Sequence, residues 1–81
     1  MNIEVTFFAL YRERVGKNKY TVRLPEMANV ADLVAEIRGQ FPLIAPPSVN
    51  IVVSVNTEYA EETDILYDGD DVCLIPPVSG G

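Results

Sequence analysis

The fold is decided by the stretch NVADLVAEIRGQF, residues 29–41, which predicts a single amphipathic helix. Its apolar residues recur at the spacing of one helix face, and they are Val30, Leu33, Val34, Ile37 and Phe41. Asn29 is a suitable N-cap, with Asp32 at the third helical position. Gly39 and Pro42 mark the end of the helix. Because only one face is apolar, the helix must cover another layer of structure.

The segments before this helix have the twofold periodicity of β-strands. Residues 2–8 alternate apolar and polar side chains, which predicts a half-buried strand, and residues 19–24 predict a second one that Pro25 ends. Between them, residues 9–15 predict a short helical turn stopped by Gly16. The helix is therefore preceded by a pair of strands.

The segments after the helix complete a sheet. Residues 41–49 are a proline-rich loop, and residues 51–56 are rich in Val and Ile and predict a third strand. Residues 57–66 are rich in turn formers, with room for a short edge strand, and residues 71–75 predict the last strand. This order indicates the α+β class, a mixed sheet packed on one main helix. A last strand parallel to the first would be reached by a right-handed crossover over that helix.

The chain ends in PPVSGG, residues 76–81, which predicts an extended tail beyond a domain of residues 1–75. Pro76 and Pro77 end the strand and stiffen the base of the tail, and the terminal glycines can thread a narrow channel. Six extended residues reach about 20 Å, enough to carry a carboxylate into a partner's active site. The pattern suggests that the reactive group is the α-carboxylate of Gly81; a frayed chain end without function is the alternative.

The composition limits the class of protein. Eighty-one residues, 48% of them hydrophobic, allow one small domain with a modest core. The single cysteine excludes an internal disulfide and favours a reducing cytoplasm. With no histidine and one cysteine there is no ligand set for zinc or an iron–sulfur cluster, so we expect no metal. No signal peptide or membrane-spanning run is recognisable, so we expect no membrane association.

Charge is unevenly distributed along the chain. All six basic residues lie among the first forty, whereas the remainder carries seven acidic residues and no basic one. A nucleic-acid-binding protein needs the opposite balance, so no nucleic-acid partner is expected. The acidic half suits docking to a positively charged partner, although a solubilising surface is the better explanation for most of these acids individually.

Several short motifs carry a resemblance to a known family. In chain order they are VTFFALYRERVG (5–16), VADL (30–33), VNTEY (55–59), DGDDV (68–72) and PPVSGG (76–81). With these motifs the chain resembles the small subunit of molybdopterin synthase, a family of ubiquitin-like sulfur carriers. The resemblance implies a β-grasp fold with a flexible Gly-Gly tail, and a role in molybdenum cofactor biosynthesis in the cytoplasm, as part of a heteromer.

The resemblance also implies a mechanism centred on Gly81. An adenylyltransferase similar to ubiquitin-activating enzymes would adenylate its carboxylate with ATP and magnesium, and sulfur would replace AMP to give a thiocarboxylate. The tail, Pro76, Pro77, Val78, Ser79 and Gly80, would then enter a pocket of the large subunit of molybdopterin synthase and donate sulfur to a pyranopterin precursor. This chain itself would bind no cofactor, and the catalytic side chains are expected on the large subunit.

A second group of candidate residues belongs to a partner interface. If the residues at odd positions of the first strand face the helix, Phe8 faces away from it, together with Cys73 and Ile75 of the last strand. The resemblance places Phe8, Tyr59 and Ile75 at hydrophobic contacts with the large subunit. The alternative is that these residues complete a small core.

Other residue patterns have ordinary explanations. Cys73 is predicted to be a packing residue, and Asp68 and Asp70 to be turn formers rather than metal ligands. The Arg12–Glu13–Arg14 run matches the family opening, and a solvated helix face with a Glu13–Lys17 pair would explain it equally well.

Two rival functions use the same activation chemistry. One is a ubiquitin-like modifier conjugated to lysines through Gly81, and the other is a sulfur carrier of the thiamine pathway. Lysine-linked adducts, compared with a free thiocarboxylate, would separate the first from a sulfur carrier.

Overall fold

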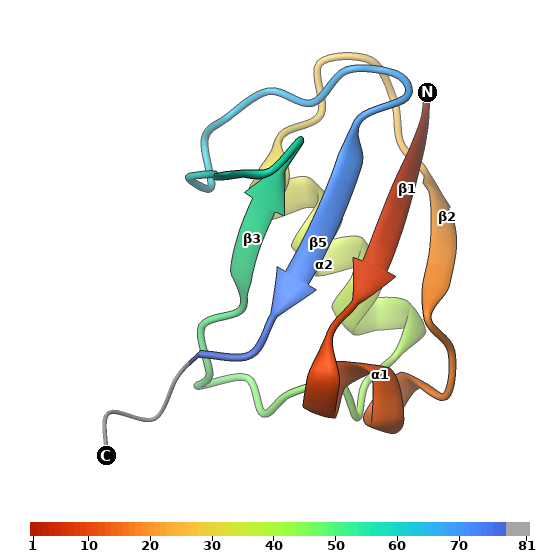
Figure 1. Ribbon diagram of the computed structural model, residues 1–81. Helices are drawn as coiled ribbons and strands as arrows, with labels where there is room; N and C mark the ends of the chain where they lie inside the picture. Colours follow the sequence, from red (N-terminus) through yellow and green to blue (C-terminus); the bar gives the residue numbers. More distant parts are fainter. Residues whose placement is uncertain (78–81) are drawn as a thin grey trace.

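A five-stranded mixed sheet with one long helix against one of its faces makes up the computed structural model, which describes residues 1–77 (Figure 1). The strands are β1 (Asn2–Phe7), β2 (Lys19–Arg23), β3 (Val52–Val55), β4 (Glu58–Tyr59) and β5 (Asp71–Ile75). The helices are α1 (Ala9–Val15) and α2 (Val30–Gln40). The strand order is β2-β1-β5-β3-β4, with β1 and β5 parallel and the other neighbours antiparallel. This is the β-grasp arrangement, so the predicted fold class is confirmed.

Helix α2 forms where the sequence predicts it. The Asn29 side chain accepts a hydrogen bond from the Asp32 amide at 2.9 Å, and the Asp32 carboxylate accepts one from the Asn29 amide at 3.0 Å. This reciprocal capping box supplies partners for amides that the first helical turn leaves free. The helix continues one residue past Gly39 and buries one face, formed by Val30, Leu33 and Ile37.

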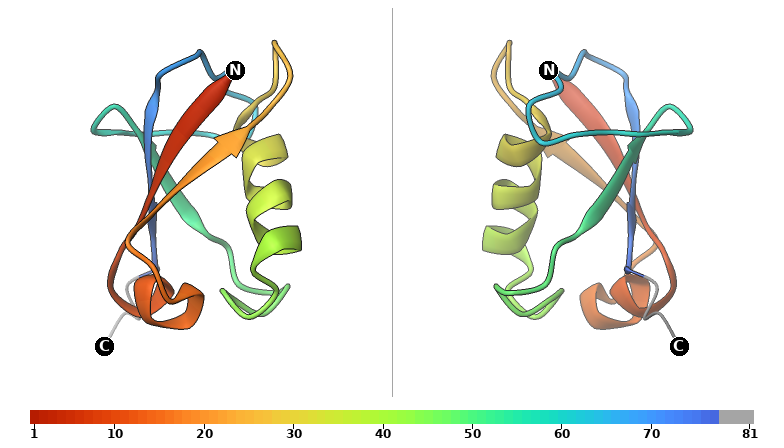
Figure 2. Two further views of the ribbon diagram at one scale, coloured as in Figure 1. Left: turned by 90° about the vertical axis from the view of Figure 1, so that its right-hand side faces the viewer. Right: turned by 90° about the vertical axis from the view of Figure 1, so that its left-hand side faces the viewer.

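The core lies between α2 and the facing side of the sheet. Alternate residues of the two central strands are fully buried there, and they are Ile3, Val5 and Phe7 of β1 with Val72 and Leu74 of β5. Since side chains alternate between the faces of a sheet, the intervening residues lie on the opposite face. No helix covers that opposite face among the described residues (Figure 2).

The strand boundaries differ from the prediction by one or two residues. The first strand ends at Phe7, because Phe8 becomes the N-cap residue of α1. The third strand ends at Val55, because Asn56 and Thr57 take positive φ angles of 50° and 73° and form the two-residue turn into β4. This turn creates the short edge strand that the sequence allowed.

The predicted Glu13–Lys17 helical pair does not form. Helix α1 ends at Val15, and Gly16 adopts the left-handed conformation, so Lys17 lies beyond the helix. Its ammonium nitrogen instead lies 5.3 Å from the ring centre of Tyr20 and 5.8 Å from that of Phe41. The lysine therefore makes a cation–π contact in place of an ion pair.

Two arginines hold the loop that follows α2. The Arg38 guanidinium donates hydrogen bonds to the main-chain oxygens of Ala45, Pro46 and Val49. Arg14 of α1 donates one to the Ile44 oxygen at 3.0 Å. Charged donors make strong hydrogen bonds, which gives this irregular loop a defined shape without regular secondary structure.

Tyr11 of α1 is buried beneath these arginines. The residue is 1% exposed, and its hydroxyl has no hydrogen-bond partner among the described residues. Burial raises the pKa of Tyr11 above its ordinary value of 10.0, although the charges of Arg38 and Arg14 act in the opposite direction. The raised pKa means that the folded protein holds this proton more tightly than the unfolded chain does.

We expect Tyr11→Phe to leave stability at neutral pH unchanged or raise it by up to about 1 kcal/mol, because it removes a buried, unpaired hydroxyl. Above pH 10 the unfolded chain loses the Tyr11 proton first, so the wild type should lose stability with rising pH and the variant should lose less. Denaturant unfolding across this range measures the difference. Tyr67→Phe, at a position 67% exposed, is the matched control and should follow the wild type. A clear destabilisation by Tyr11→Phe at neutral pH would contradict the expectation.

Candidate functional site

The base of the predicted tail follows directly from a central strand. Strand β5 lies between β1 and β3 and pairs with both of them up to Leu74 or Ile75. Pro76 is half-buried and Pro77 is exposed. The remaining predicted tail residues, Val78, Ser79, Gly80 and Gly81, lie outside the described residues, so their predicted roles remain predictions. What the structure adds is a firmly anchored strand immediately before the two prolines.

The uncovered sheet face brings the three predicted interface residues together. Phe7 pairs with Leu74, so in the same register Phe8 lies beside Ile75, and Ile75 pairs in turn with Val52 on β3. The next row across the sheet contains Cys73, Ser54 and Tyr59, because Ser54 pairs with both of the others. Phe8, Ile75 and Tyr59 therefore share one face of the sheet; Phe8 and Ile75 lie where β5 ends, and Tyr59 lies one row back, on the edge strand.

The prediction that these side chains face away from the core agrees with their exposure. Phe8 is 44% exposed and Tyr59 is 80% exposed, whereas Ile75 is half-buried. Their presence on the uncovered face is against the alternative that they complete the core. Their predicted contact with a large subunit stays a prediction.

Phe8 is also an unusual residue for its position in the fold. It is the N-cap of α1, where Ser, Thr, Asp or Asn would normally accept a hydrogen bond from the first turn. Phe8 makes no such side-chain bond. A residue at this position that makes no capping hydrogen bond and does not enter the core is a good candidate for contact with another molecule.

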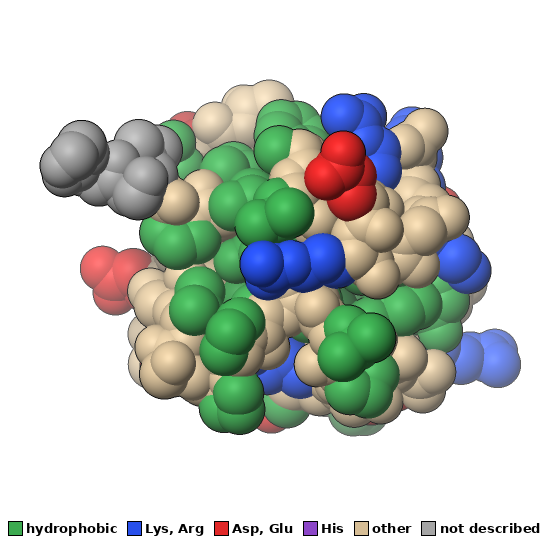
Figure 3. Space-filling model, turned by 90° about the horizontal axis from the view of Figure 1, so that it is seen from below, with side chains coloured by type: hydrophobic (Ala, Val, Ile, Leu, Met, Phe, Trp, Pro, Cys, Tyr) green, Lys and Arg blue, Asp and Glu red, His purple; other side chains and the backbone are tan. Residues whose placement is uncertain are grey.

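Sequence reasoning missed part of the apolar surface. Val52 joins the sheet face only through its pairing with Ile75, which no local pattern predicts. Leu10 of α1 and Leu43 of the following loop are 43% and 81% exposed. Figure 3 shows hydrophobic side chains gathered around basic ones at the end of the molecule that carries α1. This end of the molecule therefore carries exposed apolar residues in addition to those of the sheet face.

The acidic residues lie mainly away from Pro76, where the predicted tail begins. Four of the seven belong to β4 or to residues 60–65, and the other three lie at 68–71, before and at the start of β5. This segment runs across the end of the molecule opposite α1, whereas β5 ends near α1 (Figure 1). Docking through the acidic half stays a prediction, and it would use a different part of the surface from the apolar face.

Two acidic residues act as turn formers, as predicted. The Asp68 carboxylate accepts a hydrogen bond from the Asn2 amide at 2.7 Å. Asp70 accepts from the Tyr67 amide at 2.8 Å and from the Asn56 side chain at 3.0 Å. Within residues 1–77 no group of three potential ligand side chains is placed to hold a metal ion. Cys73 is half-buried and forms no disulfide, in keeping with a packing role.

The length and apolarity of the two helices bear on whether either could span a membrane. Neither α1 nor α2, within the part of the chain that the structure covers, is long and apolar enough to cross a bilayer.

Comparison with known proteins places these features in context. The model of the ThiS family matches residues 5–81. The molybdopterin synthase sulfur carrier subunit of Chlamydomonas reinhardtii is 39% identical over 83 residues, covering 100% of both chains. The subunit of the same name from Homo sapiens is 34% identical over 82 residues, covering 98% of this chain and 93% of its own. Among solved structures, small archaeal modifier protein 1 of H. volcanii has a TM-score of 0.86 and 26% identity, covering 95% of this chain and 98% of its own.

Proposed function

The chain belongs to the ThiS family, and we propose that it is a sulfur carrier that acts as the small subunit of a molybdopterin synthase. Relatives that carry this name match the chain over almost its whole length. The observation that carries the proposal is the position of β5. This strand is paired with a neighbouring strand on both sides. It ends beside an uncovered apolar face and is followed by the residues that lead to the terminal Gly-Gly.

The proposed chemistry takes place at the carboxylate of Gly81. In the first step the carboxylate attacks the α-phosphate of ATP, which gives an acyl adenylate and releases pyrophosphate. In the second step a sulfur nucleophile displaces AMP and leaves a thiocarboxylate. Its sulfur is a better nucleophile than a carboxylate oxygen, because sulfur is more polarizable and less tightly solvated. After sulfur transfer and hydrolysis, the carrier returns to a plain carboxylate.

Two protein partners follow from this chemistry. An adenylyltransferase would supply the ATP and magnesium site, and the large subunit would supply the pocket in which sulfur reaches the pyranopterin precursor. The sequence contains no histidine, so we expect the general acid and base groups to come from these partners. The folded body then serves to present the tail, and the apolar face serves to bind the large subunit.

Intact-mass spectrometry of the protein purified from its own cells tests the proposal. A fraction of the molecules should carry one sulfur in place of one oxygen, and fragmentation should locate that sulfur at Gly81. Treatment with an alkylating reagent should label the same group, because a thiocarboxylate is nucleophilic. Material with an unmodified terminus under all conditions that induce molybdenum cofactor synthesis would contradict the proposal.

Protein modification is a second candidate function, favoured by the similarity to a small archaeal modifier protein. An acyl adenylate or thiocarboxylate at Gly81 can also acylate a lysine amine. Isopeptide-linked Gly81 peptides in digests of whole cells would support this function. Their absence, together with a detectable thiocarboxylate, would leave the sulfur carrier role alone.

A further inference from the structure

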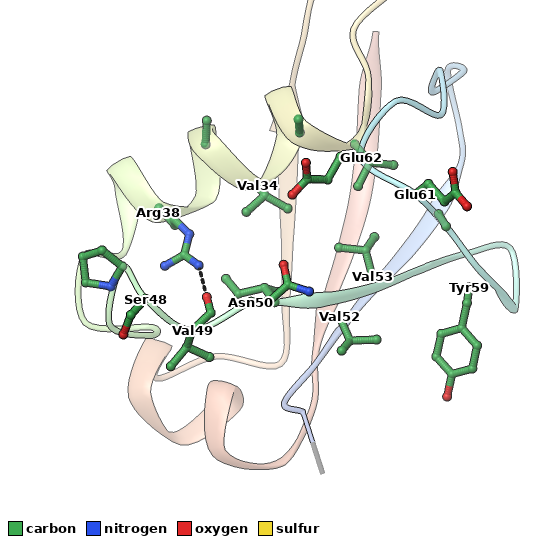
Figure 4. Close-up of a pocket in the computed structure, with 16 residues that line it drawn as sticks. Val34, Arg38, Ser48, Val49, Asn50, Val52, Val53, Tyr59, Glu61 and Glu62 are labelled. Carbon is green, nitrogen blue, oxygen red and sulfur yellow. Dashed lines mark hydrogen bonds between the residues drawn. The ribbon is translucent and has the colours of Figure 1, made fainter. Parts of the chain in front are cut away.

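A groove separates α2 from the outer edge of β3 (Figure 4). It has a volume of about 760 Å³, and its walls come from α2, from residues 47–53 and from residues 59–62. Val34 on the helix and Ile51 and Val53 on the strand side give it an apolar floor. Tyr59 lies at the rim, and its ring points away from α2, so the groove borders the uncovered sheet face at this residue.

The strand side of the groove is an incompletely paired sheet edge. Strand β4 pairs with β3 only at Ser54 and Val55, and the Ala60 amide donates one further hydrogen bond to the Val53 oxygen at 2.9 Å. Ile51 immediately precedes β3, and in a continuation of the strand its main-chain groups point to the same side as those of Val53, because alternate residues of a strand share their hydrogen-bonding direction. The amide and carbonyl of Ile51 therefore face the groove beyond the end of β4, where another strand could pair with them.

The helix side of the groove leaves space for such a strand. Ala31 and Ala35 line it, one helical turn apart, and both are exposed. Their methyl groups leave the backbone of a bound segment room to lie between the helix and β3. Larger side chains at these two positions would fill that space.

The two ends of the groove carry opposite charges. Arg38 lies at the end where β3 begins, and its guanidinium bonds to the Val49 oxygen. Glu61 and Glu62 lie at the other end, where the Glu62 main-chain oxygen accepts a hydrogen bond from the Ala31 amide at 3.0 Å. A strand antiparallel to β3, in line with β4, would place its amino end near the glutamates and its carboxyl end near the arginine.

We propose that this groove binds an extended segment of a partner protein, which adds to the sheet as an antiparallel strand alongside Ile51, beyond the end of β4. The segment has alternating aliphatic residues that face the groove, a basic residue at its amino end and an acidic residue at its carboxyl end. Main-chain hydrogen bonds give such strand addition its affinity, and the alternating side chains give it specificity. The site goes beyond the proposed function, since it uses the edge of β3, and neither Phe8 nor Ile75 lines it.

The test uses the full chain and the peptide acetyl-Lys-Val-Thr-Val-Thr-Val-Glu-amide. In amide NMR spectra, titration should shift the signals of Ile51 and Val53 more than those of Phe8 and Ile75. Replacing the peptide's lysine by glutamate should weaken binding by about tenfold, which corresponds to one lost charge contact at a rim.

Matched variants separate groove binding from general attraction to an acidic protein. Glu62→Lys should weaken binding of the lysine peptide by about tenfold, whereas Glu26→Lys, which makes the same charge change at an exposed site outside the groove, should weaken it much less. Ala35→Gln should obstruct the groove, and Glu36→Gln, on α2 but outside the lining, should not. Equal effects within either pair, or no shift at Ile51 and Val53, would overturn the proposal.

Discussion

Removal of Gly80 and Gly81 is expected to abolish sulfur loading and cofactor synthesis while leaving the folded domain unchanged. Two extended residues span about 7 Å, so the shortened chain would hold its carboxylate that far from the adenylation site. A misplacement of only about 1 Å can cost about 100-fold in rate, so the loss should exceed that factor. The shortened chain keeps every buried core residue that the structure describes, so the free energy of unfolding should stay within about 0.5 kcal/mol of wild type.

The matched variant for this experiment keeps the length of the tail. Gly81→Ala places a methyl group beside the acyl carbon, and we expect it to impair adenylation severely while the fold stays intact. Thiocarboxylate formation with purified adenylyltransferase, ATP and a sulfur donor measures both variants. Cofactor synthesis at the wild-type rate by the truncated chain would contradict the assignment of Gly81 as the reacting residue.

Phe8→Asp is expected to weaken binding to the large subunit by about 100-fold or more, while the monomer stays folded. Exposed aromatic residues at an interface are frequent hot spots whose loss costs about 2 kcal/mol or more, and a buried carboxylate adds a desolvation cost. Phe8 is 44% exposed and makes no capping hydrogen bond, so the free monomer loses little. Aspartate is in addition a favourable N-cap residue for α1, which should offset part of the lost apolar contact.

Isothermal titration against the large subunit measures the affinity, and denaturant unfolding measures the stability of the monomer. Tyr67→Asp is the matched control, because Tyr67 is an exposed aromatic residue outside the strands of the sheet face. It should leave the affinity within about threefold of wild type. Equal losses for the two variants would show that Phe8 has no special place in the interface.

The local sequence determined the elements themselves. The spacing of Val30, Leu33 and Ile37 and the Asn29–Asp32 pair specify α2, because helix periodicity and capping depend on residues within a few positions of each other. Alternation predicted the buried face of β1 and with it the outward position of Phe8. The tail motif and the resemblance it carries are likewise properties of consecutive residues.

The boundaries that were wrong depend on less local effects. The first strand ends at Phe7 because Phe8 is the N-cap of α1, a position that the alternation of apolar residues does not reveal. The end of β3 depends on the positive φ angles of Asn56 and Thr57, which neither residue type alone requires. The ammonium group of Lys17 lies near the rings of Tyr20 and Phe41, and this cation–π contact cannot be predicted from residue spacing along a helix.

Tertiary structure alone decided which further residues join the predicted surface. Val52 becomes a neighbour of Ile75 through the register of β3 on β5, and the groove exists because β4 is too short to cover the whole edge of β3. The separation of the acidic segment from Pro76 also follows from the direction of β5, which starts at one end of the molecule and finishes at the other. Short-range periodicity is written in consecutive residues, whereas strand register and the relative placement of distant segments depend on the packing of the whole chain.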